Sequence, residues 1–212
     1  MPDPLYPILD VTLCRARGLD ALAVLDAFLD GGARFIQLRD KSASSDARLA
    51  LADAVVARVH AAGGRVIVND RPDIARLAGA DGVHVGQDDM TVEDARRFLG
   101  GDAIVGLSTH DEAQVEAGLA TSASYLAVGP IYGTATKDTG YTARGLGLVA
   151  FAARRGRPIV AIGGITLERV PDVIAAGATS VAVISDLLRE DPAAMVRRFR
   201  ERLGPDAARR IV

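Results

Sequence analysis

The sequence predicts a single (β/α)8 barrel, a TIM barrel, over residues 1–212, and three observations point to this fold class. Eight short apolar or β-branched runs recur along the chain, and an amphipathic stretch follows each of them. The chain length suits one large α/β domain, and no linker or low-complexity stretch divides it. Eight strand–helix units in roughly 200 residues match the closure of such a barrel.

The predicted strands are apolar on both faces, as expected for a parallel sheet that is buried on both sides. In chain order they are Leu5–Leu9, Arg34–Leu38, Arg65–Val68, Gly82–Val85, Ala103–Leu107, Tyr125–Val128, Pro158–Ile162 and Ser180–Ile184.

Most of the predicted helices place apolar residues at spacings of three and four, and several end in glycine, the usual C-terminal stop. In chain order they span residues 19–32, 44–64, 71–80, 90–100, 110–120, 143–156, 166–177 and 191–204. An open doubly wound sheet is the alternative architecture. We disfavour it because the dinucleotide-binding fingerprint of that fold is missing and because eight units match a closed barrel.

Composition excludes several classes of function. The net charge is −2 with no basic block, so the chain lacks the electrostatic footprint of a nucleic-acid-binding protein. No apolar run approaches the length needed to cross a membrane, and the acidic, proline-rich start MPDPLYP does not resemble a signal peptide. The single cysteine, Cys14, cannot form an internal disulfide. We therefore expect a cytoplasmic protein whose partners are small molecules, with a homodimer left open.

Lysine and asparagine are rare in this chain, which has 23 arginines (25 basic residues less two lysines) and one asparagine. Lys41, Lys137 and Asn69 each come just after a short apolar run. Lysine offers a compact ammonium that arginine cannot imitate at a point-like phosphate contact. We therefore expect these three residues to serve chemistry, although their placement could also arise by chance.

Polar residues follow the predicted strands. Because barrel active sites gather at the C-terminal ends of the strands, we expect these residues to share one mouth. In strand order they are Gln37, Arg39 and Lys41; Asn69 and Asp70; Gln87, Asp88 and Asp89; Ser108, Thr109 and His110; Thr134, Thr136 and Lys137; Gly163 and Gly164; and Ser185.

Two parts of this mouth are predicted to bind anions. After the seventh strand, Gly163 and Gly164 leave backbone N–H groups open to a phosphate, and Ile184-Ser185 precedes a further helix. The alternative is that the two glycines only permit a tight turn.

Across the mouth lie the cations Arg39, Lys41 and Lys137 with the hydroxyls of Ser108, Thr134 and Thr136. Three cations and several hydroxyl donors exceed the needs of one monophosphate and suit a diphosphate. The alternative is a solvated rim, with ion pairs to Asp40, Asp46 or Asp138.

Asp70 and Asp89 are the predicted magnesium ligands, since Mg²⁺ is often held by one or two carboxylates together with substrate phosphates. The alternative for both is N-capping of the following helices. His84 lies in a strand and is interpreted as a packed core histidine, so zinc is not expected. No GxSxG motif or other conventional nucleophile is found. The expected chemistry is therefore electrostatic stabilisation of a leaving anion.

The stretches QLRDK, VNDRPDIARLAGADGVHVGQDD, VGLSTH, VGPIYGTATK, AIGGIT and VAVIS together resemble the thiamine phosphate synthase family, over about residues 34–188. This family has a (β/α)8 fold. The resemblance implies a Mg²⁺-assisted transfer of 4-amino-2-methyl-5-hydroxymethylpyrimidine from its diphosphate to 4-methyl-5-(2-hydroxyethyl)thiazole phosphate, giving thiamine phosphate and diphosphate. It further implies that the C–O bond breaks first and that no protein base is needed.

Residue by residue, the resemblance implies a role for each part of the mouth. The pyrimidine diphosphate is expected to bind Gln37, Arg39, Lys41, Asn69, Ser108 and Lys137, of which Arg39, Lys41, Ser108 and Lys137 are the expected catalytic residues. Mg²⁺ is expected at Asp70 and Asp89. The thiazole phosphate is expected at Thr134, Thr136, Gly164, Ile184 and Ser185.

Two other functions stay open. The thiazole tautomerases of the same superfamily need the phosphate site, and His110 could serve their acid–base chemistry, but they need no metal or diphosphate clamp. A non-catalytic phosphate-binding barrel would bind ligand without turnover.

Overall fold

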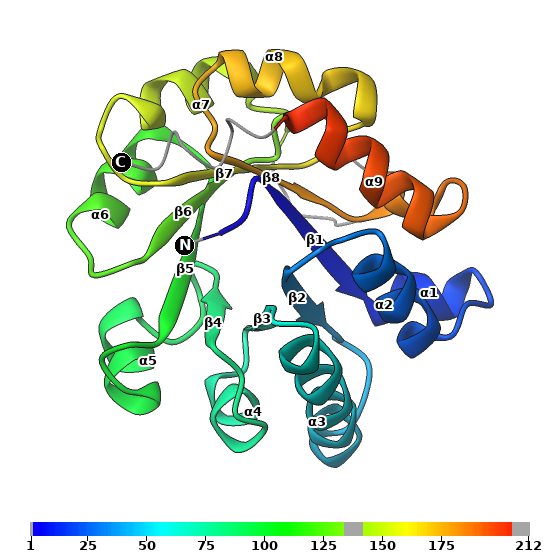
Figure 1. The fold of residues 1–212 in the computed structure, drawn as a ribbon. Helices are drawn as coiled ribbons and strands as arrows, with labels where there is room; N and C mark the ends of the chain where they lie inside the picture. Colours follow the sequence, from blue (N-terminus) through cyan, green and yellow to red (C-terminus); the bar gives the residue numbers. More distant parts are fainter. Residues whose placement is uncertain (1, 134–141, 205–212) are drawn as a thin grey trace.

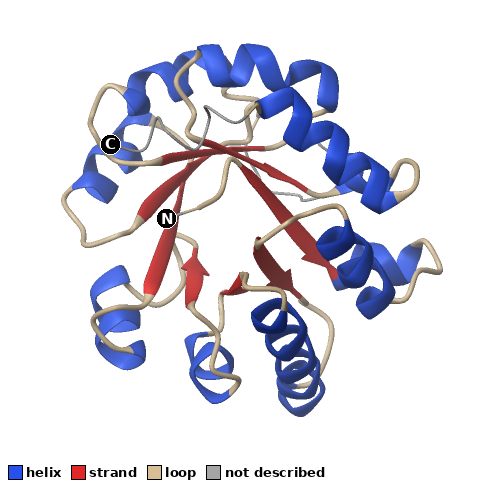
Figure 2. Cartoon of the chain, viewed as in Figure 1, coloured by secondary structure: helices blue, strands red, loops and turns tan. Residues whose placement is uncertain are grey.

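The computed structural model describes residues 2–133 and 142–204 and forms a closed, all-parallel barrel whose strands pair in chain order, β8 returning to β1. Figure 1 and Figure 2 show the strands at the centre and the helices around them. The predicted (β/α)8 fold is therefore confirmed. The strands are β1 (Leu5–Asp10), β2 (Phe35–Arg39), β3 (Arg65–Asn69), β4 (Gly82–Val85), β5 (Ile104–Thr109), β6 (Tyr125–Val128), β7 (Ile159–Ile162) and β8 (Ser180–Val183).

Helices connect the strands on the outside. They are α1 (Val11–Ala16), α2 (Ala21–Asp30), α3 (Ser45–Ala61), α4 (Pro72–Leu77), α5 (Val92–Leu99), α6 (Glu112–Leu119), α7 (Gly145–Ala153), α8 (Val170–Ala175) and α9 (Pro192–Leu203), with the 3-10 turns η1 (Leu167–Arg169) and η2 (Ser185–Leu188). Of the described helices, none combines the length and the apolar character that a membrane crossing requires.

Each predicted helix has a counterpart, but α1 and η2 were not predicted. Both are short, at six and four residues. Helix α1 begins at Asp10, whose carboxylate accepts a hydrogen bond from the Leu13 N–H at 2.9 Å. This N-cap is the local signal that could have revealed the helix.

Two hydrophobic clusters hold the barrel together. The smaller one fills the inside of the sheet and includes Tyr6, Ile8, Phe35, Ile67 and Tyr125. The larger one lies between the sheet and the helices. Because alternate strand residues serve the two clusters, the strands are apolar on both faces.

The barrel closes through contacts between its first and last strands. The Val181 N–H donates to the Pro4 carbonyl at 2.9 Å, and the Ser180 hydroxyl donates to the Asp3 carbonyl at 2.6 Å. The chain segment before β1 is thereby joined to the beginning of β8.

Candidate functional site

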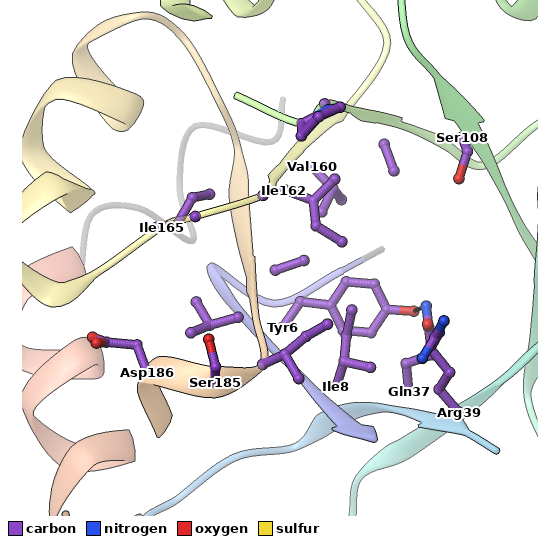
Figure 3. Close-up of a pocket in the computed structure, with 18 of the residues that line it drawn as sticks. Tyr6, Ile8, Gln37, Arg39, Ser108, Val160, Ile162, Ile165, Ser185 and Asp186 are labelled. Atoms are coloured by element: carbon purple, nitrogen blue, oxygen red, sulfur yellow. Dashed lines mark hydrogen bonds between the residues drawn. The ribbon is translucent and has the colours of Figure 1, made fainter. Parts of the chain in front are cut away.

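A cavity of about 430 Å³ opens at the C-terminal ends of the strands. Figure 3 shows Gln37, Arg39 and Ser108 on walls different from that of Ser185. The predicted site residues that line the cavity are Gln37, Arg39, Asn69, Ser108, Gly164, Ile184 and Ser185, together with Gly163 and His110. Thr134, Thr136 and Lys137 lie outside the described residues.

Thr109 does not line the cavity. It was expected at the mouth, but it is fully buried and its hydroxyl donates to the Ala127 carbonyl at 3.3 Å. Successive strand residues face opposite sides of the sheet, so its neighbour Ser108 reaches the cavity and Thr109 does not.

Lys41 and Asp70 meet at the mouth. The Lys41 ammonium lies 3.1 Å from an Asp70 carboxylate oxygen, so Asp70 is its partner instead of the Asp40 or Asp46 of the solvated-rim alternative. Asp70 has φ of 60° and is the only non-glycine residue with positive φ in the described ranges. Its backbone N–H donates to the His84 carbonyl at 2.8 Å, which ties the turn after β3 to β4. Aspartate adopts this left-handed conformation more readily than most residues, and here the turn brings the Asp70 side chain beside Lys41.

Asp89 lies beside Asp70, and the two carboxyl groups share a hydrogen bond. Burial and the neighbouring Asp70 charge raise the pKa of Asp89, against the opposing effect of the Gly86 N–H that donates to it at 2.7 Å. Burial alone would raise the pKa of Asp70, but the Lys41 ammonium outweighs burial and holds this pKa below its usual value.

The capping alternative does not apply to either carboxylate. Helix α4 begins after Arg71, without a side-chain cap, and helix α5 is capped by Thr91. Within the described ranges, no group of three or more His, Cys, Asp or Glu residues is arranged to hold a metal ion. Two adjacent carboxylates that face one another fit a cation that takes its other ligands from water and substrate, as Mg²⁺ does.

Arg39 is held by a residue that the sequence reading did not assign. Its guanidinium forms a close ion pair with Asp10 at the end of β1, and both side chains are largely buried. Because Asp10 also caps α1, this one carboxylate fixes both the helix and the arginine. The pairing of Asp10 with Arg39 in the β1–β2 register brings them together.

A chain of polar side chains crosses the floor of the cavity. Gln37 Nε2 lies 2.9 Å from Tyr6 Oη, which lies 3.0 Å from Tyr125 Oη. His84 continues the chain, with Nδ1 3.1 Å from Tyr125 Oη and Nε2 2.8 Å from Ser108 Oγ. All five are buried. His84 is thus a buried core histidine, as interpreted from the sequence, and it also has a hydrogen-bonding task.

The opposite wall is built from backbone. Gly163 and Gly164 have φ of +102° and +62°, a region that favours glycine. A Cβ at Gly163 would lie 2.6 Å from Pro130 Cα, and one at Gly164 would lie 2.6 Å from the Gly133 carbonyl oxygen. Both glycines therefore allow the tight turn and the close packing of the loop after β6, as the turn alternative expected, while their backbone lines the cavity.

Two arginines that sequence reasoning missed flank this backbone wall. Arg17 donates to the Leu188 carbonyl at 2.7 Å, and Arg169 donates to the Gly164 carbonyl at 2.6 Å. The Arg169 guanidinium also lies 4.4 Å from the centre of the Tyr132 ring. Both line the cavity, but in a chain so rich in arginine no local signal distinguishes them.

His110 lies at the cavity wall with its ring Nδ1 2.6 Å from the Gly129 carbonyl oxygen. A carbonyl accepts only, so Nδ1 carries the hydrogen. The cap of α6 is Asp111, so His110 is a wall residue and not a helix cap.

Comparisons with known proteins agree with this geometry. A family model described as thiamine monophosphate synthase matches residues 5–187. A thiamine-phosphate synthase of Mycobacterium sp. strain KMS is 41% identical, covering 95% of this chain and 96% of the relative. Another, of Xanthobacter autotrophicus, is 43% identical, covering 88% and 90%. The solved structure of a thiamine phosphate pyrophosphorylase from Pyrococcus furiosus superposes with a TM-score of 0.84 at 26% identity and covers 94% of each chain.

Proposed function

This chain belongs to the thiamine monophosphate synthase family, and we propose that it joins 4-amino-2-methyl-5-hydroxymethylpyrimidine diphosphate to 4-methyl-5-(2-hydroxyethyl)thiazole phosphate, releasing diphosphate. Family membership makes it a transferase of thiamine biosynthesis. The observation that carries the substrate proposal is the shared mouth, with a cationic and carboxylate-bearing side after β2–β4 and a glycine-lined side after β7–β8.

The diphosphate is assigned to the β2–β4 side, together with Ser108 in β5. Arg39 and Lys41 supply positive charge, and Asn69 and Ser108 add neutral polar groups at the cavity wall. Both cations already have carboxylate partners, Asp10 and Asp70, which hold them in place before substrate arrives. Such preorganised groups stabilise the negative charge that develops on the leaving diphosphate. We assign Lys137 to the same group by sequence.

Mg²⁺ is assigned to Asp70 and Asp89. Two observations support this assignment: the two carboxyl groups lie in hydrogen-bond contact, and the Lys41 ammonium already lies 3.1 Å from Asp70. When bound, the ion would neutralise charge on the diphosphate oxygens.

The thiazole phosphate is assigned to the β7–β8 side, at Gly164, Ile184 and Ser185, with Thr134 and Thr136 assigned by sequence. Backbone N–H groups suit a phosphate that stays intact through the reaction, because they bind it without offering a reactive side chain. The C–O bond to the diphosphate breaks first, and the thiazole nitrogen then attacks the pyrimidine cation with its lone pair. No protein base is needed for this step.

Incubation with both phosphorylated substrates, with and without Mg²⁺, tests the proposal. We expect thiamine phosphate and diphosphate in equal amounts, and only with the metal. Isomerisation of the thiazole phosphate alone, without metal, would instead identify a tautomerase, for which the cavity-lining His110 is the candidate acid–base group. Binding of both substrates without any product would identify a non-catalytic barrel.

A further inference from the structure

We propose that the buried chain Gln37–Tyr6–Tyr125–His84–Ser108 is a one-way hydrogen-bond relay that turns the Ser108 hydroxyl hydrogen into the cavity. There it donates to an anionic oxygen of a bound phosphate or diphosphate. In this relay His84 is a positioning residue that acts through Ser108. The identity of the acceptor as the leaving diphosphate rests on the proposed function, but the direction of the relay does not.

The direction is set at Gln37. An amide nitrogen can only donate, so Gln37 Nε2 donates to Tyr6 Oη. Tyr6 then has one hydrogen of its own, and Tyr125 Oη is the oxygen within reach at 3.0 Å. Tyr125 accepts that hydrogen and turns its own toward His84 Nδ1 at 3.1 Å. A ring nitrogen that accepts carries no hydrogen, so neutral His84 has its hydrogen on Nε2 and donates it to Ser108 Oγ at 2.8 Å.

The opposite tautomer of His84 makes the same contacts but leaves one buried hydroxyl hydrogen without an acceptor in this chain of side chains. With hydrogen on Nδ1, His84 would donate to Tyr125, and Tyr125 would donate to Tyr6. Tyr6 would then accept from both of its partners in this chain and have neither as an acceptor for its own hydrogen. Tyr6 and Tyr125 are 1% and 0% exposed. A buried donor left without an acceptor costs about 1–3 kcal/mol, which favours the Nε2–H tautomer.

The backbone makes room for this relay. Gly106 on β5 has a φ that any residue adopts, so conformational freedom does not explain it. A Cβ there would collide with the Tyr125 hydroxyl end and would lie 2.6 Å from His84 Nδ1. The rings of His84 and Tyr125 also lie nearly parallel, at an interplanar angle of 19°. Gly106 therefore keeps open the space in which Tyr125 and His84 meet.

Ser108 is the end of the relay that faces ligand. It lines the cavity, and its oxygen already accepts from His84, so its own hydrogen is available to an acceptor in the cavity. Its backbone is also fixed, because the Ser108 carbonyl accepts a hydrogen bond from Gln87 at 2.6 Å. A donor oriented in advance stabilises a developing anion without reorganisation at the moment of reaction.

The tautomer of His84 is the direct test. Nitrogen-15 NMR of histidine-labelled protein at neutral pH distinguishes a protonated from an unprotonated ring nitrogen, and the signals of His84 are identified by their loss in His84→Gln. We expect hydrogen on Nε2 and none on Nδ1. Hydrogen on Nδ1, alone or together with Nε2, overturns the relay. This readout needs no turnover, so it stands apart from any failure of the proposed function.

A double-mutant cycle in the full chain tests the link to Ser108. We expect Tyr125→Phe to lower kcat about 10-fold and Ser108→Ala about 100-fold, the range for loss of one donor to a developing anion. In the Ser108→Ala background, Tyr125→Phe should have no further effect. An equal 10-fold loss in both backgrounds would mean that Tyr125 acts only through packing.

Tyr6→Phe is the matched control, since it removes one phenol hydroxyl of the same chain but leaves the Tyr125 hydrogen free to point at His84. Its kcat should fall less than that of Tyr125→Phe. A larger fall would contradict the direction of the relay. If Tyr125→Phe does not fold, the NMR measurement on the unsubstituted chain decides the question.

Discussion

The two anion sites proposed at the barrel mouth are built from different parts of the chain. The site proposed on the β2–β4 side consists of charged side chains that each have a partner: Lys41 with Asp70, and Arg39 with Asp10. On the β7–β8 side, the cavity wall includes the backbone of Gly163 and Gly164, with Arg17 and Arg169 anchored on nearby carbonyls.

The two sides should therefore respond differently to substitution. A paired side chain can be replaced without moving the backbone, but its partner then becomes an uncompensated charge. A glycine wall carries no charge to lose, yet any side chain added there meets packed backbone. We therefore expect substitutions on the first side to act mainly through charge, and those on the second side to act through shape.

The largest expected effect is loss of the buried ion pair. Arg39→Ala leaves Asp10, which is 3% exposed, without its cation, and should lower the free energy of unfolding by about 3–5 kcal/mol. Urea unfolding measures this change. Arg58→Ala is the control, because its pair with Asp26 is exposed and should contribute about 0–1 kcal/mol. Equal losses in the two variants would show that burial of the pair does not matter.

The second-largest expected effect is on catalytic activity. Asp70→Asn keeps the shape of the side chain but removes the charge assigned to Mg²⁺, so kcat should fall by about 100-fold or more and lose its dependence on magnesium concentration. Steady-state rates over a magnesium titration measure this. Asp88→Asn changes an exposed neighbouring carboxylate in the same way and should leave the rate unchanged. Normal metal dependence in Asp70→Asn would remove Asp70 from the metal site.

On the glycine side, Gly164→Ala adds a Cβ at φ of +62° and 2.6 Å from the Gly133 carbonyl oxygen. Left-handed backbone costs a residue with a side chain about 1–2 kcal/mol, so thermal stability should fall. The KM for thiazole phosphate should rise while the KM for the pyrimidine diphosphate changes little. Gly147→Ala, in α7 with open space around it, should be neutral or slightly stabilising. Matching changes in both KM values would mean that the two sides are not separate.

The smallest effect depends on pH. Asp40 lies in the loop that carries Lys41 and accepts hydrogen bonds from the N–H groups of Ser42 and Ala43 at 2.9 and 3.2 Å. Burial works against ionisation, but these N–H groups outweigh it and hold the pKa of Asp40 below its usual 3.8. Its stabilisation is therefore present above that value and is lost as the pH falls through the folded-state pKa.

Unfolding by urea from about pH 3 to pH 7 checks this sign. Asp40→Asn keeps the acceptor but not the titration, so its stability should depend less on pH than that of the unsubstituted chain. Asp40→Ala should lose about 1 kcal/mol near neutral pH. A steeper pH dependence in Asp40→Asn than in the unsubstituted chain would contradict the direction of the pKa shift.

The strands and long helices could be predicted from the sequence because their burial repeats. Gly82–Val85 and Tyr125–Val128 were placed with the correct ends, and β1 and β3 each extend one residue further, to Asp10 and Asn69. In both cases the added residue is polar, because the strand continues into the mouth after its apolar part has ended. Apolar runs therefore locate strands better than they locate strand ends.

The candidate site was harder to predict from the sequence than the strands and helices were. Rarity distinguished Lys41 and Asn69, and position after a strand distinguished Asp70. The partner of Arg39 was missed because Asp10 looks like one more aspartate until the barrel closes and brings β1 beside β2. The relay was missed for the same reason, since Tyr6 and Tyr125 are 119 residues apart and look like ordinary core aromatics.

The junction of β1 with β8 has a consequence for synthesis of the chain. The hydrogen bonds that close it join residues 177 positions apart, so β1 has no partner on that side while the ribosome still holds residues 180–183. Until then the growing chain exposes two unpaired strand edges, which are sites for unwanted pairing with other chains. Premature termination before β8 should therefore give aggregates rather than a smaller stable barrel.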